Sequence, residues 1–294
     1  MDYSDILNEY PYIHFYTLSE NSGPGIARQY GIEHSNGTYI CFLDSGDYFY
    51  NDGINTILTA IQENTYIKLY TFSYIYDDKN ILMDRTDDKT IGSVYKRSFI
   101  EMYDIHFSKE GSYANEDYGF SRACKIIIDF LEEEWHFHSM TKHIYMPTFY
   151  EHIDKNSLTK SNNNEFFYKK LPAGIIINGT HAINIAEKAN VSVQYIIKEL
   201  CHIMAQEYFF FLSIVQERPE LADEVWELIR NFYFNYYRTY SKFSYNTLKI
   251  YFKSTSLPKI YGRVNSWQKK ITFNIDRFIK ELETEYYTPL RYLT

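Results

Sequence analysis

The chain has 294 residues, of which 19% are aromatic, and its 30 Lys and Arg against 38 Asp and Glu give a formal net charge of −8. This length is sufficient for one large domain or two modest ones. The longest largely apolar run, residues 208–215, is too short to span a bilayer, and the first residues are acidic and polar, unlike a signal peptide. Three widely separated cysteines form neither a metal-binding spacing nor a disulfide framework. We therefore expect a cytoplasmic protein without a membrane span.

The first predicted elements are a strand and a short helix. Residues 12–18 have the pattern of a short strand. A helix is predicted over residues 24–30, because Pro24 suits a first helical position and Ser22 can cap the helix. Gly31 can end this helix in a left-handed turn.

An apolar strand followed by two aspartates comes next. Residues 38–43, TYICFL, form a nearly continuous apolar run that is typical of a strand buried on both faces. Asp44 and Asp47 stand where this strand stops. Ligands of open α/β sheets bind beyond the carboxyl ends of strands, so carboxylates there indicate a cation that carries phosphates.

The rest of the N-terminal half alternates predicted helices and strands. Helices are predicted over residues 52–64 and 116–131, from the spacing of their apolar residues. Strands are predicted over residues 67–76 and 145–153. This order predicts an α/β core.

Beyond the polar break at residues 162–164 the pattern turns helical. We expect the division into domains there, with a core over residues 1–161 and an all-helical region over residues 165–294. Four helices are predicted in this region. The first covers residues 180–189 and is capped by Thr180, the second covers residues 192–216, the third starts at Pro219, and the last covers residues 267–286.

Four blocks of the N-terminal half resemble the family-2 type nucleotide-sugar glycosyltransferases with the GT-A fold. Residues 21–31, NSGPGIARQYG, are similar to the family's N-x-G-x-x-x-A-R-N-x-G segment, and residues 43–47, LDSGD, to its LDSDD-like motif. Residues 92–100, running on to 115–120, look like the acceptor-side segment with its Glu-Asp pair. Residues 148–159 look like the strand and loop that close the site. The resemblance implies a GT-A-like, mostly parallel sheet flanked by helices.

Two features depart from the family pattern. We expect the opening half of the nucleotide-binding subdomain to be absent ahead of residue 21. A second copy or partner chain, a rearranged sheet or the C-terminal region would then complete the sheet, or the gene product would be a truncated relic. The second aspartate of the family's Asp-x-Asp motif is replaced by Gly46.

The resemblance implies a set of site residues. Asp117 matches the second residue of the Glu-Asp pair and is the expected catalytic base, with Glu116 beside it. An acidic cap at the start of a helix would also explain this pair. Arg28 is expected to reach a donor phosphate.

The resemblance also implies a divalent cation, Mn²⁺ or Mg²⁺. Asp44 and Asp47 would supply carboxylate ligands, and His152 a third contact to the metal or donor. Asp47 as the cap of the following helix is the alternative reading.

A basic, aromatic stretch lies further along the chain. Residues 228–275 contain nine Lys and Arg interleaved with tyrosines, and no Asp or Glu between Leu228 and Ile275. Such a composition suits an anionic polymer acceptor. A solvated basic face over an aromatic core, or docking on the acidic remainder, is the favoured alternative.

The expected function is sugar transfer from a nucleotide-sugar, such as a UDP-sugar, to a glycan or other hydroxyl acceptor, inverting and assisted by metal. The alternative is a non-catalytic binding or structural protein built on a degenerate glycosyltransferase fold. The motifs of serine hydrolases, P-loop proteins and zinc proteases are absent from the sequence.

Overall fold

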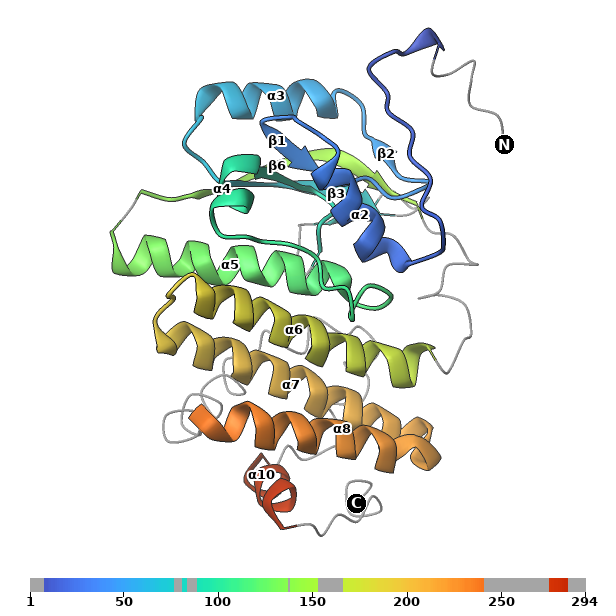
Figure 1. Cartoon of the computed structure of the whole chain (residues 1–294), viewed down its shortest axis with the longest axis vertical. Coiled ribbons are helices and arrows are strands. Elements are labelled where there is room, and N and C mark those ends of the chain that lie inside the picture. The colour runs from blue at the N-terminus through green and yellow to red at the C-terminus, as the bar shows by residue number, and fades with distance from the viewer. Residues whose placement is uncertain are drawn as a thin grey trace.

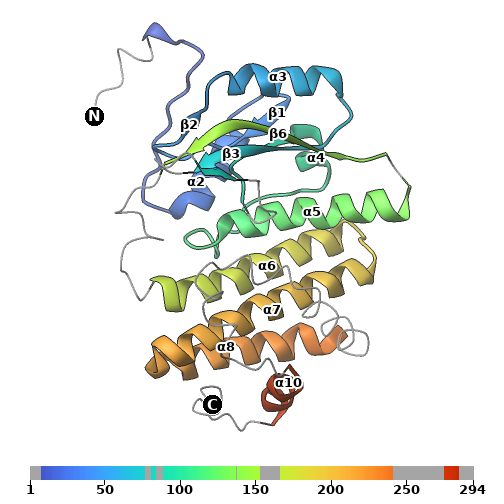
Figure 2. The same cartoon turned by 180° about the vertical axis from the view of Figure 1, so that it is seen from behind.

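The computed structural model describes residues 8–76, 81–83, 89–136, 138–152, 166–240 and 275–284. One sheet lies between helix α3 and helix α5, and further helices are stacked beyond α5 (Figure 1). The view from behind shows the same layers (Figure 2). The α/β class and the helical C-terminal region are therefore confirmed.

The sheet has six strands in the order β1-β5-β3-β6-β2, and β4 pairs with β3. Only β5 pairs with β1 among the described strands, so β1 is an edge strand. The strands are β1 (Tyr39–Cys41), β2 (Tyr48–Phe49), β3 (Leu69–Tyr76), β4 (Ile81–Met83), β5 (Ser93–Lys96) and β6 (Thr141–Glu151).

The prediction of a mostly parallel sheet needs a correction. Strands β3 and β6 pair in parallel, whereas the other pairs in the described sheet are antiparallel. A parallel return would need a long crossover, usually a helix, but the described residues between β3 and β5 contain β4 instead. Because β5 is antiparallel to both β1 and β3, strands β1, β3 and β6 still point in the same direction.

Two predictions for the N-terminal strands were wrong. Residues 12–18 form no strand, and Tyr12 and Phe15 are 74% and 54% exposed. Strand β1 is shorter than the predicted 38–43 and is not buried on both faces, because Ile40 is buried while Cys41 is exposed. The edge position of β1 explains this exposure, since an apolar run is covered only where neighbouring elements pack on it.

Helix α2 (Gly23–Glu33) begins as predicted but does not end at Gly31. Ser22 makes no capping hydrogen bond. Instead the hydroxyl of Ser112, distant in sequence, accepts a hydrogen bond from the amide of Ile26 at 2.9 Å. The Ser112 carbonyl accepts another from the amide of Gly25 at 3.2 Å. Two free amides of the first turn, those of Gly25 and Ile26, are thus satisfied by a loop that the sequence analysis had not connected to this helix.

The other predicted elements of the N-terminal half are present with shifted ends. Strand β3 is buried along most of its length, and β6 begins four residues before the predicted strand. The helices are α3 (Gly53–Glu63), α4 (Arg97–Met102) and α5 (Glu116–Glu134).

The C-terminal helices differ from prediction mainly at the start of α6. Thr180 was expected to cap a helix but lies in the middle of α6, whose first turn contains Pro172. Ser192 precedes α7 as predicted. The elements are η1 (Phe166–Lys170), α6 (Leu171–Lys188), α7 (Val193–Glu217), η2 (Pro219–Leu221), α8 (Ala222–Asn235), η3 (Tyr237–Tyr240) and α10 (Ile275–Glu283).

Two parts of the predicted organisation are not covered. The expected domain division at residues 162–164 lies outside the described residues, and so does the part of the predicted 267–286 helix before residue 275. None of the helices that the structure describes has the length and apolar character needed to cross a bilayer.

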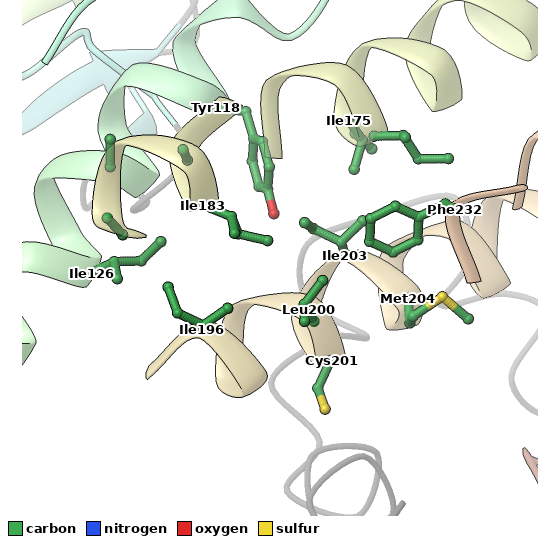
Figure 3. Close-up of a cluster of buried hydrophobic side chains, with 14 of the residues drawn as sticks. Tyr118, Ile126, Ile175, Ile183, Ile196, Leu200, Cys201, Ile203, Met204 and Phe232 are labelled. Atoms are coloured by element: carbon green, nitrogen blue, oxygen red, sulfur yellow. The ribbon is translucent and has the colours of Figure 1, made fainter. Parts of the chain in front are cut away.

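One hydrophobic core joins the sheet to the C-terminal helices. It runs from Ile40 and Tyr95 through α5, α6, α7 and α8 to Phe278 of α10. Figure 3 shows its centre, where side chains of α5, α6 and α7 meet. A smaller cluster, which includes Ile57 and Phe72, lies on the α3 side of the sheet. Helix α5 therefore packs between the sheet and the helical region.

A buried ion pair reinforces the contact between α5 and α7. Arg122 Nε donates to Glu199 Oε2 at 2.9 Å, and the Tyr118 hydroxyl donates to Glu199 Oε1 at 2.8 Å. The Glu199 side chain is 1% exposed. Burial alone would raise the pKa of Glu199, but the charges of Arg122 and His202 and these hydrogen bonds hold it below its ordinary value. Glu199 is therefore held as a carboxylate within the helical interface.

We expect Glu199→Leu to lower the free energy of unfolding by about 3–5 kcal/mol, because it removes one partner of a buried ion pair. The control Glu101→Gln breaks an exposed pair with Arg97 and should cost about 0–1 kcal/mol. Denaturation in urea measures both. Equal losses would contradict a structural role for the buried pair.

Candidate active site

The candidate site lies at one edge of the sheet, where strands that run in the same direction end. Asp44 and Asp47 follow β1, Glu151 is the last residue of β6, and His152 follows it. The first turn of α5, next to this edge, carries Glu116 and Asp117. This is the edge where ligands of α/β sheets bind.

Arg28 joins three carboxylates at this edge. Its Nη2 is 2.6 Å from Asp44 Oδ1, and its Nη1 is 2.5 Å from Glu116 Oε1 and 2.9 Å from Asp117 Oδ1. The Arg28 side chain is 12% exposed, whereas that of Asp44 is 59% exposed. The structure thus brings together four residues that the sequence analysis had placed in one site.

Local geometry explains how the acidic pair reaches Arg28. Asn115 adopts a left-handed conformation, with φ of 54°, and α5 begins at the next residue. Carboxylates in a first helical turn are favoured by the helix dipole. Helix α2 can approach the start of α5 because Gly25 has no side chain. A Cβ at this position would lie 3.1 Å from the Cβ of Glu116.

The charges in this cluster change one another's titration. Burial alone would lower the pKa of Arg28, but the charges of Asp117, Asp44 and Glu116 raise it above its ordinary value. Burial raises the pKa of Glu116, and the charge of Asp117 adds to this rise while Arg28 opposes it. The guanidinium therefore remains charged and holds carboxylates that would otherwise repel one another.

Asp47 lies in a second part of the site. Its Oδ1 accepts a hydrogen bond from the backbone N–H of His152 at 2.8 Å. Burial raises the pKa of Asp47 to about 6, the His152 hydrogen bond and Lys89 oppose the rise, and the charges of Asp44 and Glu151 add to it. This contact to Asp47 comes from the His152 backbone, and the expected contact of His152 with a metal or donor stays a prediction.

Sequence reasoning missed Lys89, Thr90 and Glu151. Lys89 Nζ lies 3.0 Å from Glu151 Oε2, and the amide of Thr90 donates to Asp117 Oδ2 at 3.3 Å. Glu151 is the last residue of β6, so the rule that singled out Asp44 at a strand end could have found it. Lys89 had no such signal, because it precedes β5 at the strand's amino end.

The predicted metal ligands are not gathered into a closed site. Among the described residues, no three side chains of His, Cys, Asp or Glu are placed to hold a metal ion. Asp44 is paired with Arg28, and Asp47 with the backbone of His152. The predicted set of Asp44, Asp47 and His152 therefore provides two neighbouring carboxylates, and further ligands would have to come from bound substrate.

Gly46, which replaces the second aspartate of the motif, has a specific backbone requirement. Its φ is 98°, a left-handed conformation that side chains disfavour. Gly31 differs, since it lies within α2 and an added Cβ would meet nothing within 4 Å. The loop between Asp44 and Asp47 is therefore built around glycine.

Gly46→Ala should lower the free energy of unfolding by about 1–2 kcal/mol, because an L-residue must adopt the left-handed conformation. Gly31→Ala, the matched control, should raise it by about 0.5–1 kcal/mol, because alanine favours a helix interior. Chemical denaturation of both variants tests the contrast. A Gly46→Ala variant as stable as Gly31→Ala would show that the loop does not need this conformation.

Most of the predicted polymer-binding stretch is not described by the structure. Residues 241–274, which hold most of the basic aromatic segment 228–275, lie outside the described residues.

Comparison with known proteins identifies the N-terminal part of the chain. Residues 2–129 match the family model described as glycosyl transferase family 2. An uncharacterized glycosyltransferase of Rickettsia conorii is 41% identical over 64 residues, which are 22% of this chain and 11% of that protein. One of Rickettsia felis is 45% identical over 56 residues, which are 19% of this chain and 9% of that protein. The matched stretches thus span about a tenth of each relative.

Solved structures of S. aureus TarS, residues 1–349, are also similar. The complex with UDP has a TM-score of 0.46 and 15% identity, covering 86% of this chain and 79% of that chain. The complex with UDP-GlcNAc has a TM-score of 0.48 and 14% identity, covering 86% and 80%. The match to glycosyl transferase family 2 over residues 2–129 confirms the resemblance for the three sequence blocks that lie within 21–120, whereas the fourth block, residues 148–159, lies outside the matched stretch.

Proposed function

We propose that this protein transfers a sugar from a nucleotide-sugar donor to a hydroxyl acceptor. The observation that carries the proposal is the convergence of Asp44, Glu116 and Asp117 on Arg28 at the carboxyl edge of the sheet. These residues lie within the stretch that matches the family. The proposal extends to the whole chain what the family match supports for residues 2–129.

Asp117 is the proposed base. It takes the proton of the acceptor hydroxyl while the hydroxyl oxygen attacks the anomeric carbon of the donor. The bond from that carbon to the β-phosphate oxygen breaks, and the nucleoside diphosphate leaves with the bonding electrons. A single displacement of this kind inverts the anomeric carbon. Arg28 keeps the neighbouring Glu116 from repelling the charge on Asp117.

The leaving diphosphate needs positive charge near Asp44. Five carboxylates, those of Asp44, Asp47, Glu116, Asp117 and Glu151, share this edge with the cations of Arg28 and Lys89. An anionic diphosphate is repelled by such an excess of negative charge unless a cation accompanies it.

Asp44 and Asp47 are the residues that would hold this cation, Mn²⁺ or Mg²⁺. The charge of Asp44 raises the pKa of Asp47, so the two carboxylates are close enough to repel each other and to attract a divalent ion. Both are oxygen ligands, which these ions prefer, and phosphate oxygens would complete the coordination. When bound, the ion supplies charge that stabilises the leaving diphosphate.

We expect Mn²⁺ to bind more weakly as the pH falls through about 6. Asp47, whose pKa is raised to about 6, becomes protonated below that value and ceases to be a ligand. Affinity should fall about fivefold between pH 6 and pH 5, as the deprotonated fraction of Asp47 falls from about one half to about one tenth. Mn²⁺ alone is the probe, because a terminal phosphate also titrates near pH 6.

Electron paramagnetic resonance of free Mn²⁺ measures this binding. Asp47→Asn should bind weakly at every pH and show no step near pH 6. A step that persists in this variant would assign the titration to another group.

The transfer itself is tested with Asp117→Asn. Thermal melts with UDP, GDP and dTDP in the presence of Mn²⁺ first identify the nucleotide, since a ligand at 100 times its Kd stabilises by about 2.7 kcal/mol. Hydrolysis of the corresponding nucleotide-sugar, with water as acceptor, then reports the reaction. Asp117→Asn should slow it about 10²–10⁴-fold with nucleotide affinity retained.

Asp129→Asn is the matched control, because Asp129 is on the same helix and pairs with Lys125 away from the site. It should leave hydrolysis unchanged. Nucleotide binding without hydrolysis in the unmodified protein, or no binding of any nucleotide, would favour the alternative of a non-catalytic protein on this fold.

A further inference from the structure

We propose that Asn178, on α6, is a positioning residue that holds both sides of the charge cluster through one loop. The loop comprises residues 107–115 and precedes α5. Asn178 lies outside the stretch that matches the family. The catalytic meaning of this inference rests on the proposed function, whereas its structural part is independent of it.

Asn178 is completely buried and bonds to the 107–115 loop twice. Its Nδ2 donates to the carbonyl oxygen of Gly111 at 3.1 Å and to that of Ala114 at 2.8 Å. An amide nitrogen carries two hydrogens, so one side chain satisfies two carbonyls. An ionised aspartate has no hydrogen to donate, and an apolar residue of similar size has no donor either, so neither could satisfy these two carbonyls.

The loop and α6 are in close contact around this side chain. A Cβ added to Gly111 would lie 2.3 Å from Asn178 Oδ1, and one added to Gly119 would lie 2.9 Å from Asn178 Cβ. One added to Gly174 would lie 2.4 Å from the Ala114 carbonyl oxygen. The absence of side chains at these glycines lets α6 approach the loop and the start of α5.

The same loop caps the helix that carries Arg28. The Ser112 hydroxyl donates to the Ser22 carbonyl at 2.7 Å and accepts from the Ile26 amide at 2.9 Å. The Phe107 amide donates to Gln29 Oε1 at 3.1 Å, next to Arg28. Ser112 lies between the two residues whose carbonyls Asn178 holds.

The loop also determines where the acidic pair begins. Asn115 is its last residue and directly precedes Glu116, and the Asn115 Nδ2 donates to the Leu171 carbonyl of α6 at 2.8 Å. A shift of the loop would therefore move Glu116 and Asp117 relative to Arg28. Asn178 thus acts on the site from a distance, through backbone that touches both α2 and α5.

The variant Asn178→Asp tests this inference, because it keeps the shape and removes both donors. Hydrogen exchange measured by mass spectrometry reports on residues 22–28, which Asn178 does not touch in any contact described above. We expect exchange there to accelerate about tenfold or more, as expected for loss of a local constraint. Exchange in α8 should stay close to that of the unmodified protein.

Two controls on the same helix separate positioning from stability. Ile183→Val trims the core between Tyr118 and Ile196 (Figure 3), and Thr180→Val replaces a buried hydroxyl. Neither should accelerate exchange in residues 22–28 when the variants are compared at equal distance from their melting temperatures. Acceleration that is equal in the controls, or uniform over the chain, would overturn the proposal.

A second variant keeps the test valid if Asn178→Asp does not fold. Ser112→Ala cuts the link between the loop and α2, and Asn178→Ala cuts the link to α6 more mildly. If Asn178 acts through the loop, adding Asn178→Ala to Ser112→Ala should change exchange in residues 22–28 by less than Asn178→Ala alone. Fully additive effects would contradict the route through Ser112.

Turnover gives the catalytic part of the test. With the nucleotide-sugar identified above, Asn178→Asp should lower kcat for hydrolysis about 10–100-fold, since small displacements of a base have such effects, while the Ile183→Val enzyme keeps its kcat. Altered exchange with unchanged kcat would overturn the role in catalysis. If no nucleotide binds, the proposed function fails while hydrogen exchange still decides whether Asn178 positions the loop.

Discussion

The site depends on one buried guanidinium, which binds carboxylates from two other parts of the chain. Arg28 comes from α2, Asp44 from the loop after β1, and Glu116 and Asp117 from the start of α5. Without a cation between them these carboxylates would repel one another at close range. The guanidinium has several donors in a fixed plane, so it fixes directions as well as neutralising charge. The positions of α2, the loop after β1 and α5 are therefore coupled.

This coupling places demands on residues that carry no charge. Ser112 supplies the cap that α2 lacks in its own sequence, and its loop leads directly into α5. On the other side the loop rests on α6, whose core is continuous with that of α5. The helical region thus contributes to the geometry of a site whose charged residues all precede it. This differs from a core and an accessory region that fold around separate interiors.

Much of this arrangement could be predicted from local sequence. Asp44 and the Glu116–Asp117 pair stood in recognisable segments, and the ends of equally directed strands identified the edge where they meet. The predicted end of α2 at Gly31 was wrong, because glycine only weakly disfavours a helix. Gly31 lies within α2 at a position where an added Cβ would meet no other atom within 4 Å. Thr180 was assigned to a cap because its type favours caps, but packing of α6 against α5 overrides this preference.

Other errors came from contacts between residues distant in sequence. The burial of β1 was overestimated because an apolar run does not reveal how many neighbours its strand will have. The partners of Ser112 are 86 and 90 residues away in the sequence, that of Lys89 is 62 residues away, and those of Asn178 are 64 and 67 residues away. No local pattern therefore marks these roles. The continuous core has a practical consequence. A shortened protein that stops after β6 would expose to water the face of α5 that packs on α6 and α7, including Tyr118 and Ile126, and would be prone to aggregate. The part of the chain that matches the family is therefore expected to aggregate when it is expressed without the C-terminal helices.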